Sequence, residues 1–141
     1  MTLGVTLRDK LSGNQAVVTK YGQLVVAPVE YGTSSLVSLA TTGVAFSLVE
    51  PLAGHGIVVT DIIASADKNV SNTTPAGIDI YTSTEIDSLT KTSALVRPQL
   101  VRADNIAMIG LNLLVPGGLF INATTTDASV LLTMIYYRIK L

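Results

Sequence analysis

The sequence predicts an all-β fold, organised as a two-sheet β-sandwich or jelly roll of about seven or eight strands with an extended N-terminal arm. Val, Ile and Thr supply 44 of the 141 residues, and their β-branched side chains suit a pleated strand better than a helix. Turn-forming residues interrupt the chain at short intervals, and the segments between them are short and apolar. A chain of this length fits one domain.

The N-terminal part of the chain is predicted to lie outside the sandwich. Residues 1–35 are expected to form the extended arm, and residues 36–141 the sandwich. Within the arm, Tyr21-Gly22 separates two β-prone segments and is compatible with a tight hairpin or with a bend in one extended arm. The arm ends in small, weakly patterned residues at 31–35. We therefore expect the arm to need a partner surface in order to become ordered.

Three strands separated by turns are predicted in the first half of the sandwich. The second of them contains the longest β-branched run and has no helical spacing. In the third, Ile78 and Ile80 face one way and Asp79 and Tyr81 the other, because side chains alternate along a strand. The predicted strands are residues 43–49, 57–66 and 77–82, with a turn at 51–56 and a polar loop at 67–75.

Proline and glycine shape the second half. Residues 83–93 are predicted to contain at most one short turn of helix, because capping residues precede Ile86 and Leu89, which are three apart. Pro98 has no amide hydrogen, so residues 94–103 are predicted to form an edge strand or a broken one. The remaining predicted strands are residues 106–115, 119–123 and 129–140, after turns at 104–105, 116–118 and 124–127.

The composition indicates that part of the surface is buried in an assembly. Charged residues make up 13% of the chain, against roughly 25% in an ordinary soluble domain. Mean hydropathy is +0.52, yet no segment approaches the roughly 20 apolar residues of a membrane span. Residues 129–140 are largely apolar on both strand faces, so this strand is expected to be covered on both sides or to lie at a subunit contact.

Charge and cysteine content exclude several classes of function. The net charge is −1 and basic residues do not cluster, so neither nucleic acid nor a membrane is expected as a partner. Cysteine is absent, which excludes disulfides, thiolate metal sites and cysteine nucleophiles. The first ten residues lack the pattern of a secretory signal, so we expect an unprocessed chain made in a cytoplasm.

The residue patterns that could carry chemistry each have a simpler structural interpretation. His55 is the single histidine, and it lies between two glycines in a predicted exposed turn. Asp67, Asn69 and Ser71 match the first ligand positions of a calcium loop, but the glycine and glutamate that such a loop requires are missing. The glycines at 54, 56, 117 and 118 lack the spacing of a phosphate-binding loop and are interpreted as turn residues.

Carboxylates in the middle of the chain do not form a predicted pair across a cleft. Only Glu85 and Asp87 are brought close, in a loop. The other candidates, which fall on separate predicted elements, are Glu50, Asp61 and Asp79. We predict no catalytic, cofactor-binding or metal-binding residue, no cofactor, and a protein that is not an enzyme.

Three blocks of sequence resemble small virion proteins of tailed bacteriophages. Residues 17–28, VVTKYGQLVVAP, have the form of a short segment near the start of those proteins. The second block is residues 57–63 with 67–70, and the third is residues 110–115 with 118–124. The resemblance covers about residues 15–135. It implies a head decoration (cement) protein, a small β-sandwich that clusters, often as a trimer, on the capsid surface.

From this resemblance we expect a non-enzymatic protein that stabilises the head by binding the outer surface of the major capsid protein shell as a homo-oligomer, with a trimer as the expected form. Its expected location is the capsid exterior of the virion, after synthesis in the bacterial cytoplasm. The alternative is a host- or glycan-binding β-sandwich of a phage tail or fibre. Sugar-binding platforms favour Trp and Tyr, and the chain has no Trp and five Tyr.

Overall fold

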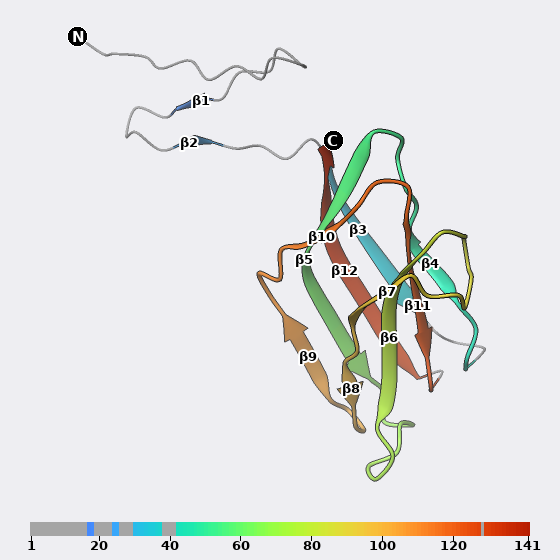
Figure 1. Cartoon of the computed structure of the whole chain (residues 1–141). Helices are drawn as coiled ribbons and strands as arrows, with labels where there is room; N and C mark the ends of the chain where they lie inside the picture. Colours follow the sequence, from blue (N-terminus) through green and yellow to red (C-terminus); the bar gives the residue numbers. More distant parts are fainter. Residues whose placement is uncertain (1–16, 19–23, 26–29, 38–41, 128) are drawn as a thin grey trace.

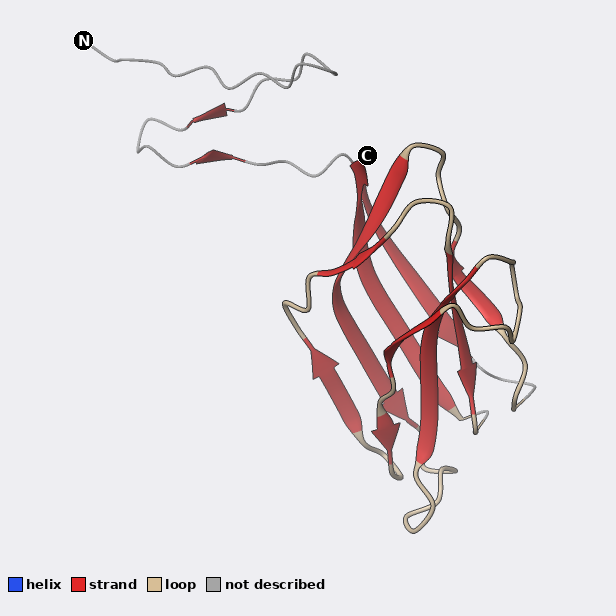
Figure 2. Ribbon diagram, viewed as in Figure 1, coloured by secondary structure: helices blue, strands red, loops and turns tan. Residues whose placement is uncertain are grey.

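The computed structural model describes residues 17–18, 24–25, 30–37, 42–127 and 129–141, and it shows two antiparallel sheets packed face to face (Figures 1 and 2). The described part of the chain contains strands, turns and bends, and no helix. The predicted all-β sandwich is confirmed.

The first sheet, called the β5–β12 sheet, is built around the two longest strands. β12 (Val130–Lys140) lies between β5 (His55–Ala66) and β3 (Glu30–Val37). The other edge of β5 is paired by β9 (Asn105–Met108) and β10 (Leu113–Val115), which follow one another along it. The predicted strand at 106–115 is therefore one edge strand broken in two, and the break contains Gly110 and Asn112, both with positive φ.

The second sheet, called the β6–β11 sheet, has the order β4-β11-β6-β7. Its central strands are β6 (Ala76–Ser83) and β11 (Phe120–Thr125), and β4 (Phe46–Val49) lies at one edge. The other edge is formed by β7 (Ser93–Val96) and β8 (Gln99–Leu100), which both pair with β6. The break between them falls at Pro98, as predicted.

The connections between the sheets give a jelly roll. From β3 onward the chain passes from sheet to sheet at almost every step, and the two broken edge strands each count as one strand of the roll. The orders β3-β12-β5-β10 and β4-β11-β6-β7 are those of an eight-stranded double Greek key. The core lies between the sheets, with fully buried Ile62, Ile80, Ile121, Leu132 and Met134 near its centre.

A bulge in β5 determines which of its side chains enter the core. Ile135 of β12 lies opposite Asp61, but the next residue, Tyr136, lies opposite Val59, so Thr60 is an extra residue in the pairing. The Thr60 hydroxyl donates a hydrogen bond to the Ile135 carbonyl oxygen at 3.2 Å. The bulge lets odd-numbered Ile57 and Val59 and even-numbered Ile62 and Ala64 face the same core.

Two expectations for the chain differ from the structure. Residues 83–93 form no turn of helix: bends and turns connect β6 to β7, because side chains from the sheet bind this segment as a loop. Residues 30–35, which the sequence places in the arm, belong to β3 and pair with β12. Backbone hydrogen bonds hold an edge strand even where small residues give it no apolar pattern.

Within the rest of the predicted arm, two short strands are described. β1 (Val17–Val18) pairs antiparallel with β2 (Leu24–Val25), so these residues form the hairpin alternative for the segment around Tyr21-Gly22. The other residues of the predicted arm lie outside the described part of the chain.

Candidate functional site

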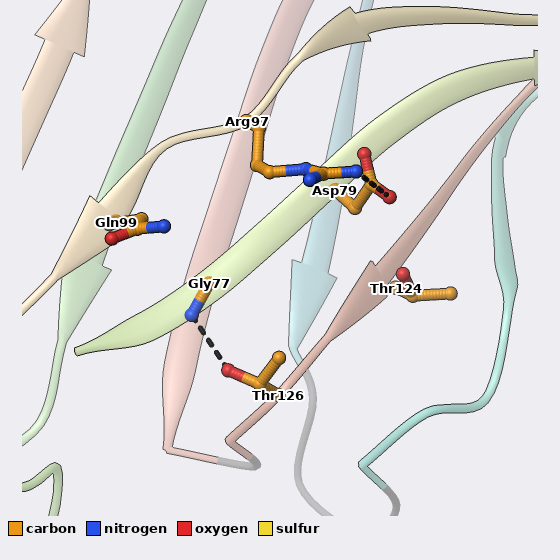
Figure 3. A pocket seen from close by; sticks show the side chains of 6 residues that line it. All are labelled: Gly77, Asp79, Arg97, Gln99, Thr124 and Thr126. Atoms are coloured by element: carbon orange, nitrogen blue, oxygen red, sulfur yellow. Dashed lines mark hydrogen bonds and ion pairs between the residues drawn. The ribbon is translucent and has the colours of Figure 1, made fainter. Parts of the chain in front are cut away.

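A polar pocket lies on the outer side of the β6–β11 sheet, where the broken edge strand passes over β6 (Figure 3). Its volume is about 270 Å³. Asp79 of β6 and Thr124 of β11 are cross-strand partners, and Arg97 enters from the break between β7 and β8. The complete lining is Gly77, Asp79, Arg97, Gln99, Thr124 and Thr126.

The charges at this pocket form one compact group. Asp79 Oδ2 accepts hydrogen bonds from Lys91 Nζ and from Arg97 Nη2, the latter at 3.1 Å. Lys91 Nζ also lies 5.0 Å from the ring centre of Tyr81. Burial raises the pKa of Asp79, but the hydrogen bonds and positive charges of Lys91 and Arg97 outweigh it and hold this pKa below its usual range. The ionised group carries two positive charges and one negative charge.

The floor of the pocket is fixed by backbone contacts. The Gly77 amide donates a 2.7 Å hydrogen bond to Thr126 Oγ1, and the Thr126 amide donates to the Gly77 carbonyl oxygen at 2.9 Å. On the other side of β6, the Ile78 amide donates to the Pro98 carbonyl oxygen at 2.9 Å. The break at Pro98 therefore brings Arg97 and Gln99 over Gly77 and Asp79. The pocket combines guanidinium, carboxylate, amide and hydroxyl groups, which suit a hydroxyl-rich or anionic ligand.

The rest of this outer face is covered by the loop at residues 84–92. Tyr81 lies with Asp79 on the face of β6 opposite to Ile78 and Ile80, as predicted. It is fully buried under this loop, and its hydroxyl donates to the Ser88 carbonyl oxygen at 2.8 Å. Asn122 lies beside Tyr81 in the sheet and donates to the carbonyl oxygens of Glu85 at 3.0 Å and Ser88 at 3.2 Å. Burial, followed by the negative charge of Asp79, raises the pKa of Tyr81.

The candidates singled out in the sequence are not brought together into a catalytic arrangement. His55 begins β5, and its Nδ1 hydrogen-bonds to the Ala53 carbonyl oxygen at 2.9 Å. Asp67 Oδ1 accepts the Asn69 amide hydrogen at 3.2 Å, and Ser71 Oγ accepts those of Thr73 and Thr74 at 3.1 Å, so these side chains shape the 67–75 loop. Within the described ranges, His, Asp and Glu form no group of three or more that could hold a metal ion.

The other candidate carboxylates and the candidate glycines also have structural roles or lie on the surface. Asp61 Oδ1 accepts the Gly110 amide hydrogen at 3.0 Å, and Asp87 Oδ1 accepts that of Ser47 at 2.6 Å. Glu50 and Glu85 lie on the surface. Gly54 and Gly118 adopt φ values of 72° and 81° in turns, which only glycine adopts without strain. The interpretation of the glycines as turn residues is confirmed at these two positions.

The two outer faces of the sandwich differ in polarity. The β6–β11 sheet presents the ionic group around Asp79 and the loop at residues 84–92, on which Ile86 and Leu89 are exposed. The β5–β12 sheet presents apolar side chains, several of which are exposed although they lie in the middle of strands: Ile63, Leu114 and Leu131. The sequence predicted the two apolar sides of residues 129–140 but not the ionic pocket. The one sign of this pocket in the sequence was the position of Asp79 on the strand face opposite to Ile78 and Ile80.

No protein-family model matches the chain, and no curated protein sequence is significantly similar to it. Within the described residues, no helix has the length and apolarity needed to cross a membrane.

Proposed function

We propose that the chain is a bacteriophage capsid decoration (cement) protein, which binds the outer surface of the major capsid protein shell as a homo-oligomer and so stabilises the head. The observation that carries this proposal is the difference between the two outer faces. An assembly subunit needs apolar surface to bury against its neighbours and polar surface to leave in water. The β5–β12 sheet offers the first, and the β6–β11 sheet carries the ionic group around Asp79 together with two exposed apolar side chains, Ile86 and Leu89, on its loop.

A decoration protein can stabilise a capsid by burying apolar surface alone, without any catalytic chemistry. If each subunit buries about 1,000 Å² of apolar surface, the gross gain is about 25 kcal/mol. The loss of translational and rotational freedom and the ordering of flexible segments reduce this figure substantially. Even a modest net free energy of binding, repeated at many positions on the shell, helps the shell to resist internal pressure. The resemblance of residues 17–28, 57–70 and 110–124 to phage virion proteins supports the same role.

The test is to locate the chain in the virion. Particles of the phage that encodes it are separated into heads and tails, and each fraction is analysed by quantitative mass spectrometry. We expect the chain in the head fraction at many copies per particle, and we expect purified chain to rebind heads from which it has been removed. Recovery of the chain in tails alone would overturn the proposal.

A second candidate function is glycan binding in a tail or fibre, and the polar pocket at Asp79 favours it. Paired charged and hydroxyl side chains are suited to recognise sugar hydroxyls. None of the six residues that line this pocket is aromatic, which places this candidate second. If it holds, Arg97→Ala should abolish binding of the chain to host cells, whereas Ile86→Ala, on the neighbouring loop, should leave binding unchanged.

A further inference from the structure

The outward side of the β5–β12 sheet, called here the apolar face, is a continuous surface of aliphatic and aromatic side chains. Its members alternate along the strands with core residues, and none of them belongs to the core cluster or packs against it. Leu131 is 42% exposed, Ile63 43% and Leu114 56%. The described residues of this face are Ile63, Leu114, Leu131, Ile135, Tyr137 and Ile139, together with Val58, which lies between Leu114 and Tyr137 in the strand pairing and is only 7% exposed.

Strand pairing shows that these side chains are neighbours. Leu114 lies opposite Val58, and Val58 lies opposite Tyr137, which gives one row across three strands. Ile63 lies opposite Thr133 of β12 and Ala107 of β9, which gives a second row. Residues two apart on one strand share a face, so the rows join into one surface.

The apolar face carries almost no charge. Among the described outward positions of β5 and β12, Asp61 is the one ionisable acid or base other than Tyr137, and its Oδ1 accepts the Gly110 amide hydrogen at 3.0 Å. Arg138, also on β12, is directed to the other side of the strand, where its guanidinium donates to the Glu50 carbonyl oxygen at 3.1 Å. Apart from the Asp61 carboxylate, these described positions present no charge that would repel a second copy of the same surface.

The sheet that carries the apolar face has about the footprint of a stable protein interface. β12 has 11 residues, which at a rise of about 3.3 Å per residue gives a length of about 36 Å. The four strands β10, β5, β12 and β3, about 4.8 Å apart, give the sheet a width of about 19 Å and hence a footprint of about 700 Å². Specific interfaces bury about 800 Å² per partner.

We propose that the apolar face is the contact between two copies of this chain, packed sheet to sheet about a two-fold axis. Two sheets stack face to face about 10 Å apart when their facing side chains are apolar, and a two-fold contact needs only one self-complementary patch. The footprint of the sheet and the scarcity of charge on its outward side fit this arrangement. The proposal rests on the proposed function for the expectation of self-association, and it deepens that function by assigning the association to one face and to a dimer, in place of the trimer that the resemblance implies.

The test compares full-length variants by sedimentation velocity over roughly 1–100 µM. Ile63→Lys and Leu131→Lys each place a charge on the apolar face at a partly exposed position, so the fold should tolerate it, which circular dichroism melting checks. Ile86→Lys is the matched control, because Ile86 is 52% exposed on the loop over the opposite sheet. We expect a dimer for the unaltered chain and for Ile86→Lys. We expect the dissociation constant to rise at least 100-fold for the two face variants.

A second measurement does not depend on charge substitutions. Because the chain has no cysteine, Ile63→Cys and Ile86→Cys each introduce a single thiol. A short bismaleimide should cross-link Ile63→Cys into dimers and leave Ile86→Cys largely uncross-linked. The reverse pattern would overturn the proposal.

Three other results would also overturn it. The first is a monomer at all concentrations, as expected if the chain's own residues 1–29 or the capsid shell cover the face. The second is a trimeric mass, which a two-fold contact does not produce. The third is a dimer that the face variants leave intact. Virion fractionation is independent of these outcomes: a chain found on heads but monomeric in solution refutes the dimer alone, and a dimer found only in tails refutes the cement function alone.

Discussion

Asp79 carries a part of the stability that is lost at low pH. Its pKa in the folded protein is lowered, so the folded state binds this proton less tightly than the unfolded state does. The stabilisation is therefore complete above the pKa of the unfolded chain, near pH 4, and is lost as the pH falls through the folded value. Lys91 and Arg97 are 40% and 63% exposed, so solvent screens both ion pairs.

Asp79→Asn should accordingly lower the free energy of unfolding by about 1 kcal/mol at pH 7 and by much less below pH 3. Urea unfolding at a series of pH values measures the difference. Glu85→Gln is the control, since Glu85 makes no ion pair with any described residue, and it should give no comparable effect. A difference that grows toward low pH would contradict the assigned direction of the pKa shift.

Ala103 adopts a backbone conformation that glycine prefers. Its φ is 57°, a left-handed value that costs a residue with a β-carbon about 1 kcal/mol or more. Ala103→Gly should therefore raise the free energy of unfolding by up to about 1 kcal/mol, after the entropic cost of glycine is subtracted. Ala107→Gly is the matched control, because Ala107 is equally exposed but lies in β9.

The control substitution should lower stability by about 0.5–1 kcal/mol, so the two variants should change the denaturant midpoint in opposite directions. Equal losses in both would mean that the left-handed conformation of Ala103 carries no strain.

At the scale of single elements, the loop at residues 84–92 depends on one buried side chain from a distant strand. Asn122 of β11 holds the Glu85 and Ser88 carbonyl oxygens through its side-chain amide. Asn122→Ala removes both hydrogen bonds, which costs about 1–3 kcal/mol because the acceptors stay partly buried. We expect trypsin to cleave native Asn122→Ala after Lys91 at least tenfold faster than it cleaves the unaltered chain.

Thr124→Ala is the control for this prediction. Thr124 lies two residues further along the same face of β11 and makes no hydrogen bond that holds the loop within the described structure. Its cleavage after Lys91 should match that of the unaltered chain. If Asn122→Ala is cleaved no faster, the loop is held by other contacts, with the Tyr81 hydroxyl first among them.

The elements also show which features local sequence could predict. Alternation predicted that Ile78 and Ile80 would share one face of their strand, and the missing amide hydrogen of Pro98 predicted an edge strand or a broken one; both are confirmed. Residues 57–66 have apolar side chains on both faces, so the local sequence did not reveal the bulge at Thr60. Because of this bulge, odd-numbered side chains face the core before Thr60 and even-numbered side chains face it afterwards. The helical signals at Ile86 and Leu89 were overridden by tertiary hydrogen bonds from Tyr81 and Asn122.

At the scale of the whole molecule, the low charge content of the chain is consistent with the apolar outer face of the β5–β12 sheet. The sequence predicted buried surface from the scarcity of charge and from the two apolar sides of residues 129–140. The position of that surface could not be predicted from the sequence, because it depends on which strands pair. β12 forms the surface only together with β5 and β10. The ionic pocket was equally hidden, since Asp79, Lys91 and Arg97 are up to 18 residues apart and meet only when the chain turns back at the edge of the sheet.

The jelly roll should unfold as one cooperative unit, because both sheets share a single core. Leu132 of β12 is fully buried in that core with Ile80 and Ile121 of the opposite sheet. Leu132→Ala should lower the free energy of unfolding by about 3 kcal/mol, which corresponds to a roughly 100-fold faster exchange of amides that exchange only on global unfolding.

Native-state hydrogen exchange by mass spectrometry should therefore show the same acceleration in peptides from β5 and β12 and in peptides from β6 and β11. Leu131→Ala is the matched control: the neighbouring side chain on the same strand points out of the core and is 42% exposed, so it should accelerate exchange far less. Faster exchange confined to the β5–β12 sheet would mean that the sheets open independently, and that the shared core does not couple them.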